Sequence, residues 1–381
     1  MDVREFIAES EKLFIEDEAS SRKYIIDRLA EQRKKLVALV NQLDDASLKE
    51  HFSVKPETVT GRVRRLYDAL IGSVRLYLDG RFGESRERIF SAFFDNTKEE
   101  HNPLPSFSAP KGCNYFRIRE NPAYSLYRRE EIFHIPFERR SAVSNQRFSV
   151  SGYPCLYLGS SIYCCWEETN RPNVDTCNVV SMRNTRGLRF IDLSIPGLDE
   201  DGFSERSVYQ LVLPLACSLR VSDPGVSFKA EYIIPQNVLS CIISRGGEEA
   251  GNPPFDGIIY TSNIYGRTEC LFNDKRLLAN YVLPILKSRE SGLCENLTGS
   301  FELSEPTSML MERLRKDKRL NRKATTGTAT PAKDGDLTED YGYGTGVWSP
   351  YPWTIWGETE SQVKGRPHER IILKDPANKP E

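Results

Sequence analysis

The chain has 381 residues, with 52 Lys and Arg against 54 Asp and Glu, and a formal net charge of −2. This near balance argues against broad nucleic-acid binding, which usually leaves a basic footprint. Hydrophobic residues make up 39% and aromatic residues 10%, which is typical of a globular chain long enough for two or three domains. No run approaches the roughly 18 apolar residues of a membrane span, and no signal core follows the charged N-terminus. We therefore expect a cytoplasmic protein with neither membrane nor nucleic-acid partners.

The cysteines and histidines favour neither disulfides nor a metal site. The nine cysteines include no CxxC pair, so they indicate reduced, mostly buried thiols. Only four histidines are present, and none stands at zinc-ligand spacing from cysteines. Cys164 and Cys165 lie at a predicted helix start, where their apolar neighbours favour packing over nucleophilic chemistry.

Residues 1–98 are predicted to form a helical N-terminal domain. Apolar residues recur at helical spacing in RLAEQRKKLVALVNQL, with charges on the opposite face. Pro56 and Thr58 indicate the start of a further helix that Gly80 ends, and another helix follows in ESRERIFSAFF. Because this region contains no catalytic constellation, we interpret it as a scaffold, a partner-binding module or a regulatory element.

A mixed domain is predicted for residues 99–300. It starts in a Pro-, Ser- and Gly-rich boundary at 99–112. Strand-like and helical segments then alternate, which indicates an α+β fold. The expected strands are NYFRIR, PCLYLGS, LRFIDLS, FDGIIYTS and TECLFN, and the expected helices are SIYCCWEET, SERSVYQLVLPLACSL and AEYIIPQNVLSCII.

The C-terminal part is predicted to contain a flexible linker at 301–340 and an aromatic-containing tail at 341–381. Large apolar residues nearly vanish after about residue 315. Three of the four tryptophans then follow, at 348, 353 and 356. Because disordered tails are usually poor in aromatics, we expect residues 341–357 to dock on this protein or on a partner. The alternative is an unstructured tail.

The strongest chemical signal is the segment RFSVSGYPCLYLGSSIYCCWEE at 147–168. A turn precedes the strand CLYLGS, and Ser160 or Ser161 then caps a helix. Glu168 lies seven residues after Ser161, almost two turns, and therefore shares a helix face with it, whereas Glu167 is rotated by about 100°. A carboxylate on this small, apolar face is paired or functional, because burying it alone is costly. On local grounds alone, a solvated helix residue is the alternative reading of Glu168.

This segment resembles the core motif of the RES-domain family, which is named for its Arg, Glu and Ser. The family spacing of Arg, Gly, Pro, Tyr and Glu is matched by Arg147, Gly152, Pro154, Tyr157 and Glu168. The family Ser follows a strand in a pattern like G-I-x-Y-x-S, and DGIIYTS supplies Ser262, with ECLF expected as the next strand. The family's earlier Arg follows an aromatic residue, and YFRIR offers Arg117, with Arg119 as its rival. The resemblance covers residues 114–285.

Several features depart from the family pattern. Phe148 and Ser149 stand where the family commonly has Trp and Asn, and Ser160 stands where an acidic residue is frequent. The family explains neither the N-terminal helices nor the C-terminal tail.

The resemblance implies an ADP-ribosyltransferase-like fold and an enzyme that cleaves the nicotinamide–ribose bond of NAD, acting as a toxin or defence effector. The departing nicotinamide leaves positive charge on the ribose, and we assign the stabilising carboxylate to Glu168. The pyrophosphate suits guanidinium groups, here Arg117 and Arg147. Tyr157 offers a ring to the nicotinamide or its ribose, and Ser262 offers a hydroxyl to the ribose or amide. Glu168, Arg147 and Tyr157 are thus the predicted catalytic residues.

The acceptor and the partners stay open at this point. Phosphorolysis requires inorganic phosphate and a second anion site, for which Arg128, Arg139 and Arg140 are candidates, whereas hydrolysis requires only water. His134 is expected to be structural. The candidate partners are an antitoxin or regulatory protein and further copies of this chain. Two alternatives to NAD degradation are an ADP-ribosyltransferase that modifies a macromolecule and a non-catalytic nucleotide-binding regulatory protein.

Overall fold

The computed structural model describes residues 1–15, 24–95, 102–245, 255–285, 292–315 and 351–372. Within these ranges, helices precede a mixed sheet region, so the α+β prediction is confirmed. None of the helices described is both long and apolar enough to span a membrane.

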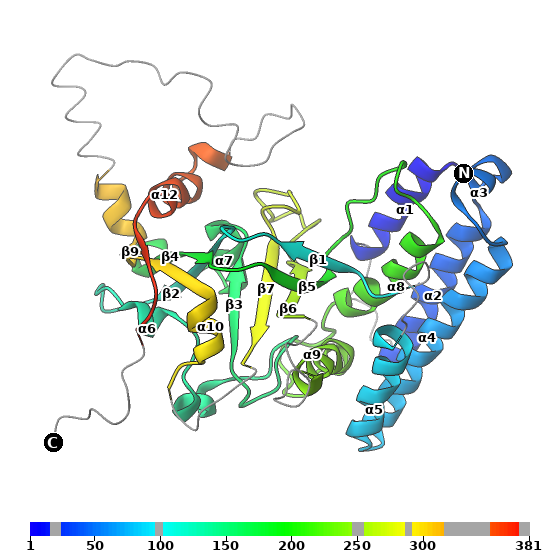
Figure 1. Ribbon diagram of the computed structural model, residues 1–381, viewed down its shortest axis with the longest axis horizontal. Coiled ribbons are helices and arrows are strands. Elements are labelled where there is room, and N and C mark those ends of the chain that lie inside the picture. Colours follow the sequence, from blue (N-terminus) through cyan, green and yellow to red (C-terminus); the bar gives the residue numbers. More distant parts are fainter. Residues whose placement is uncertain (16–23, 96–101, 246–254, 286–291, 316–350, 373–381) are drawn as a thin grey trace, which may run out of the picture.

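The N-terminal region consists of helices that pack side by side (Figure 1). As predicted, a helix begins at Pro56 and Gly80 lies just beyond its end, with φ 78°. The elements are α1 (Val3–Ile15), α2 (Ile25–Asn41), α3 (Asp45–His51), α4 (Pro56–Leu78), α5 (Phe82–Ile89) and the π-helical turn η1 (Phe90–Phe94).

The N-terminal helices share one hydrophobic core with later parts of the chain. Their buried apolar residues belong to one continuous cluster with those of α8 (Glu205–Ser218), α9 (Ile233–Arg245) and one face of the sheet. The reason lies in α8, which is buried on nearly all sides. A helix that is apolar all round needs neighbours on both sides, and here the sheet and the N-terminal helices supply them.

The described strands form one sheet in the order β1-β5-β6-β7-β3-β2-β4-β8-β10, and β9 pairs with β4. Strands β5 and β6 pair in parallel, whereas the other pairs are antiparallel. The strands are β1 (Ser106–Ala109), β2 (Asn114–Glu120), β3 (Cys155–Gly159), β4 (Cys177–Asn184), β5 (Leu188–Leu193), β6 (Gly257–Thr261), β7 (Ala279–Pro284), β8 (Phe301–Ser304), β9 (Thr307–Ser308) and β10 (His368–Glu369).

The two faces of the sheet are covered by different elements. In β3, Leu156 and Leu158 pack into one core, whereas Cys155 and Tyr157 face the other, as the alternation of strand side chains requires. Helices α8 and α9, with the N-terminal helices behind them, cover the Tyr157 face. The opposite face contacts α6 (Arg129–Ile132) and α10 (Glu295–Ser300). Short 3-10 turns lie at Phe137–Ala142, Val174–Thr176, Ala230–Tyr232 and Tyr351–Trp353.

Two predictions for the second half of the chain are wrong. The predicted strand TECLFN lies in a series of turns, and Leu271 is 63% exposed. The strand that follows Ser262 is β7 instead. The predicted linker at 301–340 is ordered over its first part, because β8 and β9 pair with β4 and residues 309–315 are helical. Alternating apolar residues in FELS fill the core beneath α10. Residues 316–340 lie outside the described ranges.

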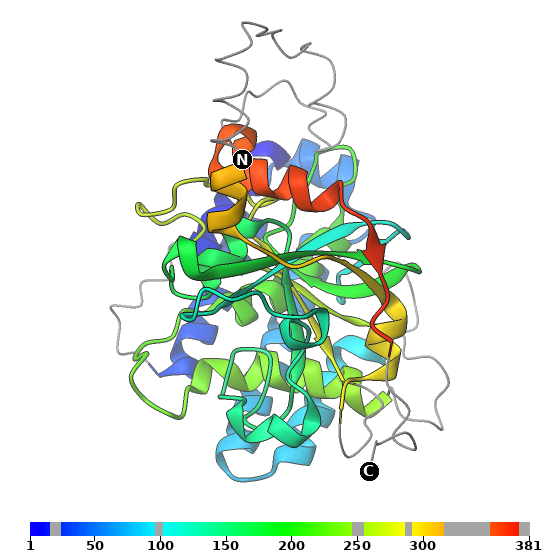
Figure 2. The same cartoon turned by 90° about the vertical axis from the view of Figure 1, so that its left-hand side faces the viewer.

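The C-terminal segment packs on the sheet region, at the end remote from the N-terminal helices (Figures 1 and 2). Helix α12 (Ile355–Lys364) follows the turn at Tyr351–Trp353 and leads into β10. Tyr351 is fully buried, and Trp356 packs against Tyr163 and Trp166. Docking of the aromatic tail is thus confirmed for these residues, whereas 341–350 lie outside the described ranges.

Candidate active site

A cleft of about 520 Å³ is lined by residues of β2, β3, β6 and β7, and its volume is within the size range of small-molecule sites. Arg117, Arg147, Tyr157 and Glu168 all line it. Ser262 lines an adjoining pocket that shares Arg147 with the cleft, and its hydroxyl lowers the pKa of Glu168. The five residues that the sequence singled out therefore meet in one place, although they come from three strands or their ends, one helix and one loop.

Helix α7 (Ile162–Glu168) begins at a well-formed cap. The Ser161 Oγ accepts a hydrogen bond from Cys164 N at 2.9 Å and donates one to Leu277 O at 2.6 Å. Ser161 is thus the cap, whereas Ser160 Oγ accepts from Ala279 N in the neighbouring strand. Gly159 permits this tight strand-to-helix turn, because a Cβ there would lie 2.6 Å from Cys165 Sγ.

Glu168 is the last residue of α7; the residue is exposed, and it lines the cleft. Asn280 Nδ2 donates to Glu168 Oε1 at 2.9 Å. Burial raises the pKa of Glu168, and the Ser262 hydroxyl, the Arg147 charge and the Asn280 amide act in the opposite direction. The neighbouring Glu167 instead pairs with Arg171 at 2.8 Å and does not line the cleft. The structure therefore selects Glu168, as its position on the helix predicts.

Arg117 on β2 is fixed by backbone carbonyls. Its Nε donates to Ile132 O at 2.7 Å and its Nη1 to Tyr157 O at 2.6 Å. Burial lowers the pKa of Arg117 to about 10, so it remains a cation at neutral pH. Arg119 lies outside the cleft, where its guanidinium stacks on Tyr127 and bonds Glu131 O. Of the two rivals, Arg117 is the one that lines the cleft.

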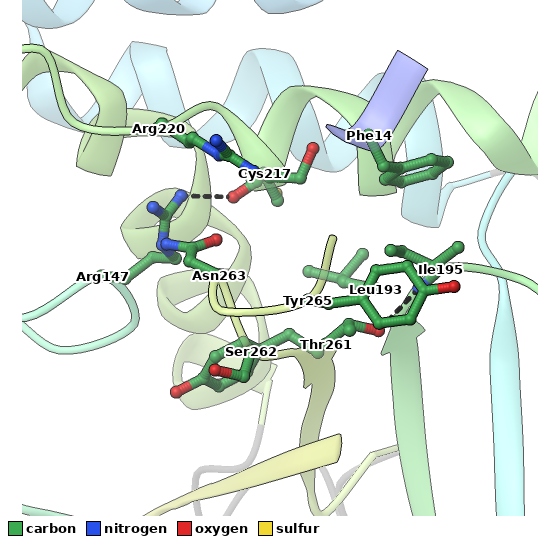
Figure 3. A pocket seen from close by; sticks show the side chains of 12 residues that line it. Phe14, Arg147, Leu193, Ile195, Cys217, Arg220, Thr261, Ser262, Asn263 and Tyr265 are labelled. Atoms are coloured by element: carbon green, nitrogen blue, oxygen red, sulfur yellow. Dashed lines mark hydrogen bonds between the residues drawn. The ribbon is translucent and has the colours of Figure 1, made fainter. Parts of the chain in front are cut away.

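Arg147 lies between the cleft and the adjoining pocket (Figure 3). Its Nη1 donates to Cys217 O at 2.6 Å and to Leu219 O at 2.9 Å, at the end of α8. The guanidinium carbon lies 5.5 Å from the centre of the Tyr232 ring. Within the described ranges, neither Arg147 nor Arg117 forms an ion pair with a carboxylate. Each guanidinium is therefore oriented by neutral carbonyls and keeps N–H groups for an anion.

Aromatic rings form the remaining wall. Tyr157 on β3 and Tyr260 on β6 line the cleft with Tyr232. Ser149 Oγ and Tyr157 Oη are 3.0 Å apart, and Phe148 packs under Tyr260 with ring centres 4.7 Å apart. Phe148 and Ser149, which depart from the family pattern, thus support two of the cleft's rings. Burial raises the pKa of Tyr157 well above its usual value, so its hydroxyl stays neutral.

The structure does not bring the proposed phosphate-binding arginines to the cleft. Arg128 lies on an exposed turn beside Glu131, and Arg140 Nε donates to Gly152 O. Arg139 is also exposed. None of the three lines the cleft, because the turns that carry them lie at the surface. This part of the prediction is wrong for a site shared with Glu168.

The structural interpretations of His134 and the paired cysteines are confirmed. His134 Nδ1 contacts Ile135 O at 2.9 Å and its Nε2 accepts from Cys294 N at 2.9 Å. Burial lowers the pKa of His134 to about 4, so the ring is neutral at physiological pH. Burial raises the pKa of Cys164 well above its usual value and raises the pKa of Cys165 to about 12. Both thiols are therefore poor nucleophiles.

Four cleft residues were missed: Asn280, Asn263, Tyr260 and Tyr232. Tyr260 and Tyr232 lie in the segments GIIYTS and EYIIPQ, both of which carried the family resemblance, so a signal existed. Asn263 directly follows the family serine. Asn280 had no local signal, because its position depends on strand pairing: it lies opposite Tyr260 in β6 and opposite Gly159 in β3.

Two comparisons with known proteins found a match to this chain. The family model described as RES domain matches residues 116–285. A protein of Bacillus subtilis (strain 168), YopC, whose name describes it as a candidate toxin, is 32% identical over 212 residues, covering 51% of this chain and 46% of its own length. The chain thus spans about half the length of this curated relative. No solved structure matches. All five predicted site residues lie inside the family match, which covers residues 116–285 of this chain.

Proposed function

We propose that this chain binds NAD in the cleft and cleaves the bond between nicotinamide and ribose, with inorganic phosphate or water as the acceptor. The observation that carries this proposal is the charge arrangement. One solvent-exposed carboxylate, Glu168, lines a cleft with two guanidinium groups that form no ion pair with a described carboxylate. A ligand with one cationic end and a dianionic centre suits such a cleft, and NAD has both.

Glu168 acts at the bond that breaks. When the C–N bond cleaves, nicotinamide leaves with the bonding electron pair as a neutral ring, and positive charge develops on the ribose. A fixed carboxylate beside that carbon stabilises the charge more in the transition state than in the ground state. Asn280 hydrogen-bonds Glu168 at 2.9 Å, which orients the carboxylate before NAD binds.

Arg117 and Arg147 bind the pyrophosphate. Charge-assisted hydrogen bonds from guanidinium to phosphate oxygens are strong and directional. Both side chains are already oriented by backbone carbonyls, so little side-chain entropy is lost when the anion binds. The aromatic wall of Tyr157, Tyr232 and Tyr260 offers ring faces to the nicotinamide, whose positive charge suits a π surface.

We further propose that NAD loss makes the protein a toxin, restrained by an antitoxin or regulatory protein. The support is the name of YopC, which is given to a protein twice as long as its match to this chain. A toxin of this kind acts by breaking down NAD itself. The reaction therefore releases nicotinamide without a protein or nucleic acid as the acceptor.

The test is to incubate the full chain with NAD, with and without phosphate, and to separate the products. NAD carrying label in its ADP-ribose part is used. Phosphorolysis gives a labelled ADP-ribose phosphate only with phosphate present, and hydrolysis gives labelled ADP-ribose in both samples. Label on added cell protein or nucleic acid, with little small product, would instead indicate an ADP-ribosyltransferase. Absence of free nicotinamide in every sample would refute the proposal.

A further inference from the structure

Glu360 is a buried carboxylate in the C-terminal segment, 75 residues beyond the end of the RES match at 285. It lies on α12 and is only 1% exposed. A buried carboxylate needs hydrogen bonds, since its desolvation is costly. Glu360 Oε1 accepts one from Ile162 N at 2.7 Å and another from Tyr351 Oη. The first of these reaches the helix that ends at Glu168.

The Ile162 amide is one of the N–H groups at the start of a helix that have no partner within the helix. Ser161 caps α7 at Cys164 N, and Glu360 accepts from Ile162 N. Both acceptors are buried. The start of α7 is therefore fixed by two side chains, one from the RES match and one from outside it. A carboxylate is also favourable beside the positive end of a helix.

Apolar contacts support the same pairing of α12 with α7. Val363 and Ile162 belong to one buried cluster together with Cys165. The rings of Trp356 and Trp166 have centres 5.4 Å apart. Helix α12 thus contacts α7 along its length, and the hydrogen bond from Ile162 fixes the axial position of α7 within that contact.

We propose that Glu360 is a positioning residue for the reaction: by accepting a hydrogen bond from the first turn of α7, it sets where α7 presents Glu168 in the cleft. The inference rests on the proposed function. Helix α7 is only seven residues long, so a displacement at Ile162 reaches Glu168 with little loss. A displacement of about 1 Å at a catalytic group can lower a rate by about 10²-fold.

Glu360 can have this positioning role whether its carboxyl group is protonated or ionised at neutral pH. Burial raises the pKa of Glu360 to about 7, and the Tyr351 hydroxyl, the Ile162 amide and the Lys364 charge oppose that rise. In both protonation states, the Oε1 oxygen accepts from Ile162 N. Glutamine keeps an acceptor oxygen at this position, whereas alanine removes it.

The test compares three variants of the full chain: Glu360→Ala, Glu360→Gln and the matched control Val363→Ala. Val363 lies on the same helix, is fully buried and belongs to the apolar cluster that contains Ile162 and Cys165. We expect Glu360→Ala to lower kcat for nicotinamide release by about 10- to 100-fold. KM should change less, because Arg117 and Tyr157 lie on strands. Glu360→Gln should restore kcat to within about threefold, and Val363→Ala should leave it near wild type.

Folding is checked at the same time by circular dichroism and by amide hydrogen exchange of residues 162–168. Exchange in this segment should accelerate in Glu360→Ala and not in Glu360→Gln. A folded Glu360→Ala variant with wild-type kcat, or a loss of kcat in Val363→Ala equal to that in Glu360→Ala, would overturn the inference. If the wild-type chain releases no nicotinamide, the proposed function fails, and hydrogen exchange alone then decides whether Glu360 fixes α7.

Discussion

The residues that line the cleft and the adjoining pocket fall into two groups, which differ in the contacts that hold them in position. Arg117 lies on β2, where it pairs with Val180 of β4, and Tyr157 lies on β3, where it pairs with Val282 of β7, so backbone pairing with one neighbouring strand holds each of them. Glu168 lies at the end of a short helix, and Ser262 begins a loop. These two are positioned by side chains, some of which come from outside the RES match.

The loop that follows β6 shows this dependence on the N-terminal helices. Tyr265 Oη donates to Glu11 Oε1 at 2.5 Å, and Lys275 Nζ lies 3.2 Å from Glu11 Oε2. Glu11 lies on α1, and Phe14 of the same helix lines the pocket beside Ser262 (Figure 3). The groups on the sheet that are proposed to bind NAD are therefore held within the RES match, whereas the groups proposed to act on the ribose also depend on both flanking regions.

The largest expected effect comes from the carboxylate at the end of α7. Glu168→Gln should lower kcat by about 10²- to 10³-fold, because it removes the charge that stabilises the ribosyl cation. The matched control is Glu167→Gln, which breaks the ion pair with Arg171 but leaves the cleft intact. Initial rates of nicotinamide release measure both. Similar losses in the two variants would contradict the assignment.

A loss of about tenfold in kcat/KM is expected for Arg117→Lys. Lysine keeps the charge but cannot donate to two carbonyls and a phosphate in one plane, and a charge-assisted hydrogen bond contributes about 1.5–3 kcal/mol. Arg119→Lys, two residues along the same strand, is the control and should change kcat/KM by less than about twofold. If the Arg119 variant is the more impaired of the two, the assignment of Arg117 is wrong.

The pH profile tests the environment of Glu168. Burial raises the pKa of Glu168, so the ionised fraction falls as the pH drops, starting from a pH above the usual glutamate range. We expect kcat/KM to rise with pH through an inflection above 4.5. Because the Ser262 hydroxyl and the Arg147 charge lower this pKa, Ser262→Ala should move the inflection to higher pH. An inflection that shifts to lower pH would show that Ser262 does not stabilise the carboxylate.

The smallest effect is expected at α1. Glu11→Ala removes the hydrogen bond to Tyr265 and the ion pair with Lys275, which are partly exposed contacts. Such pairs contribute at most about 1 kcal/mol, so kcat should fall by about two- to fivefold. Glu9→Ala, which breaks only the pair with Lys12 on the same helix, should leave kcat unchanged. Equal rates for both variants would show that α1 does not influence the Ser262 loop.

The sequence predicts the residues in local motifs of this site better than the contacts between distant segments that complete it. Glu168, Tyr157 and Ser262 stand in local patterns of turn, strand and helix, and local patterns are readable without a structure. The contacts of Asn280 and Glu360 depend on pairing between segments more than 100 residues apart along the chain, which no local pattern records. The predicted linker failed at β8 for the same reason, since FELS becomes a strand only through its pairing with β4. The core that the N-terminal helices share with α8 has no local signal either, because it joins segments far apart along the chain.

One measurement tests the central claim most directly: proton NMR of NAD incubated with the full wild-type chain, beside an equal amount of Glu168→Gln. The account predicts that free nicotinamide appears as NAD disappears, in equal amounts, with the wild type, and that the variant leaves NAD largely intact over the same time. Intact NAD in both samples, whether or not phosphate is added, or equal release by both proteins, would contradict it.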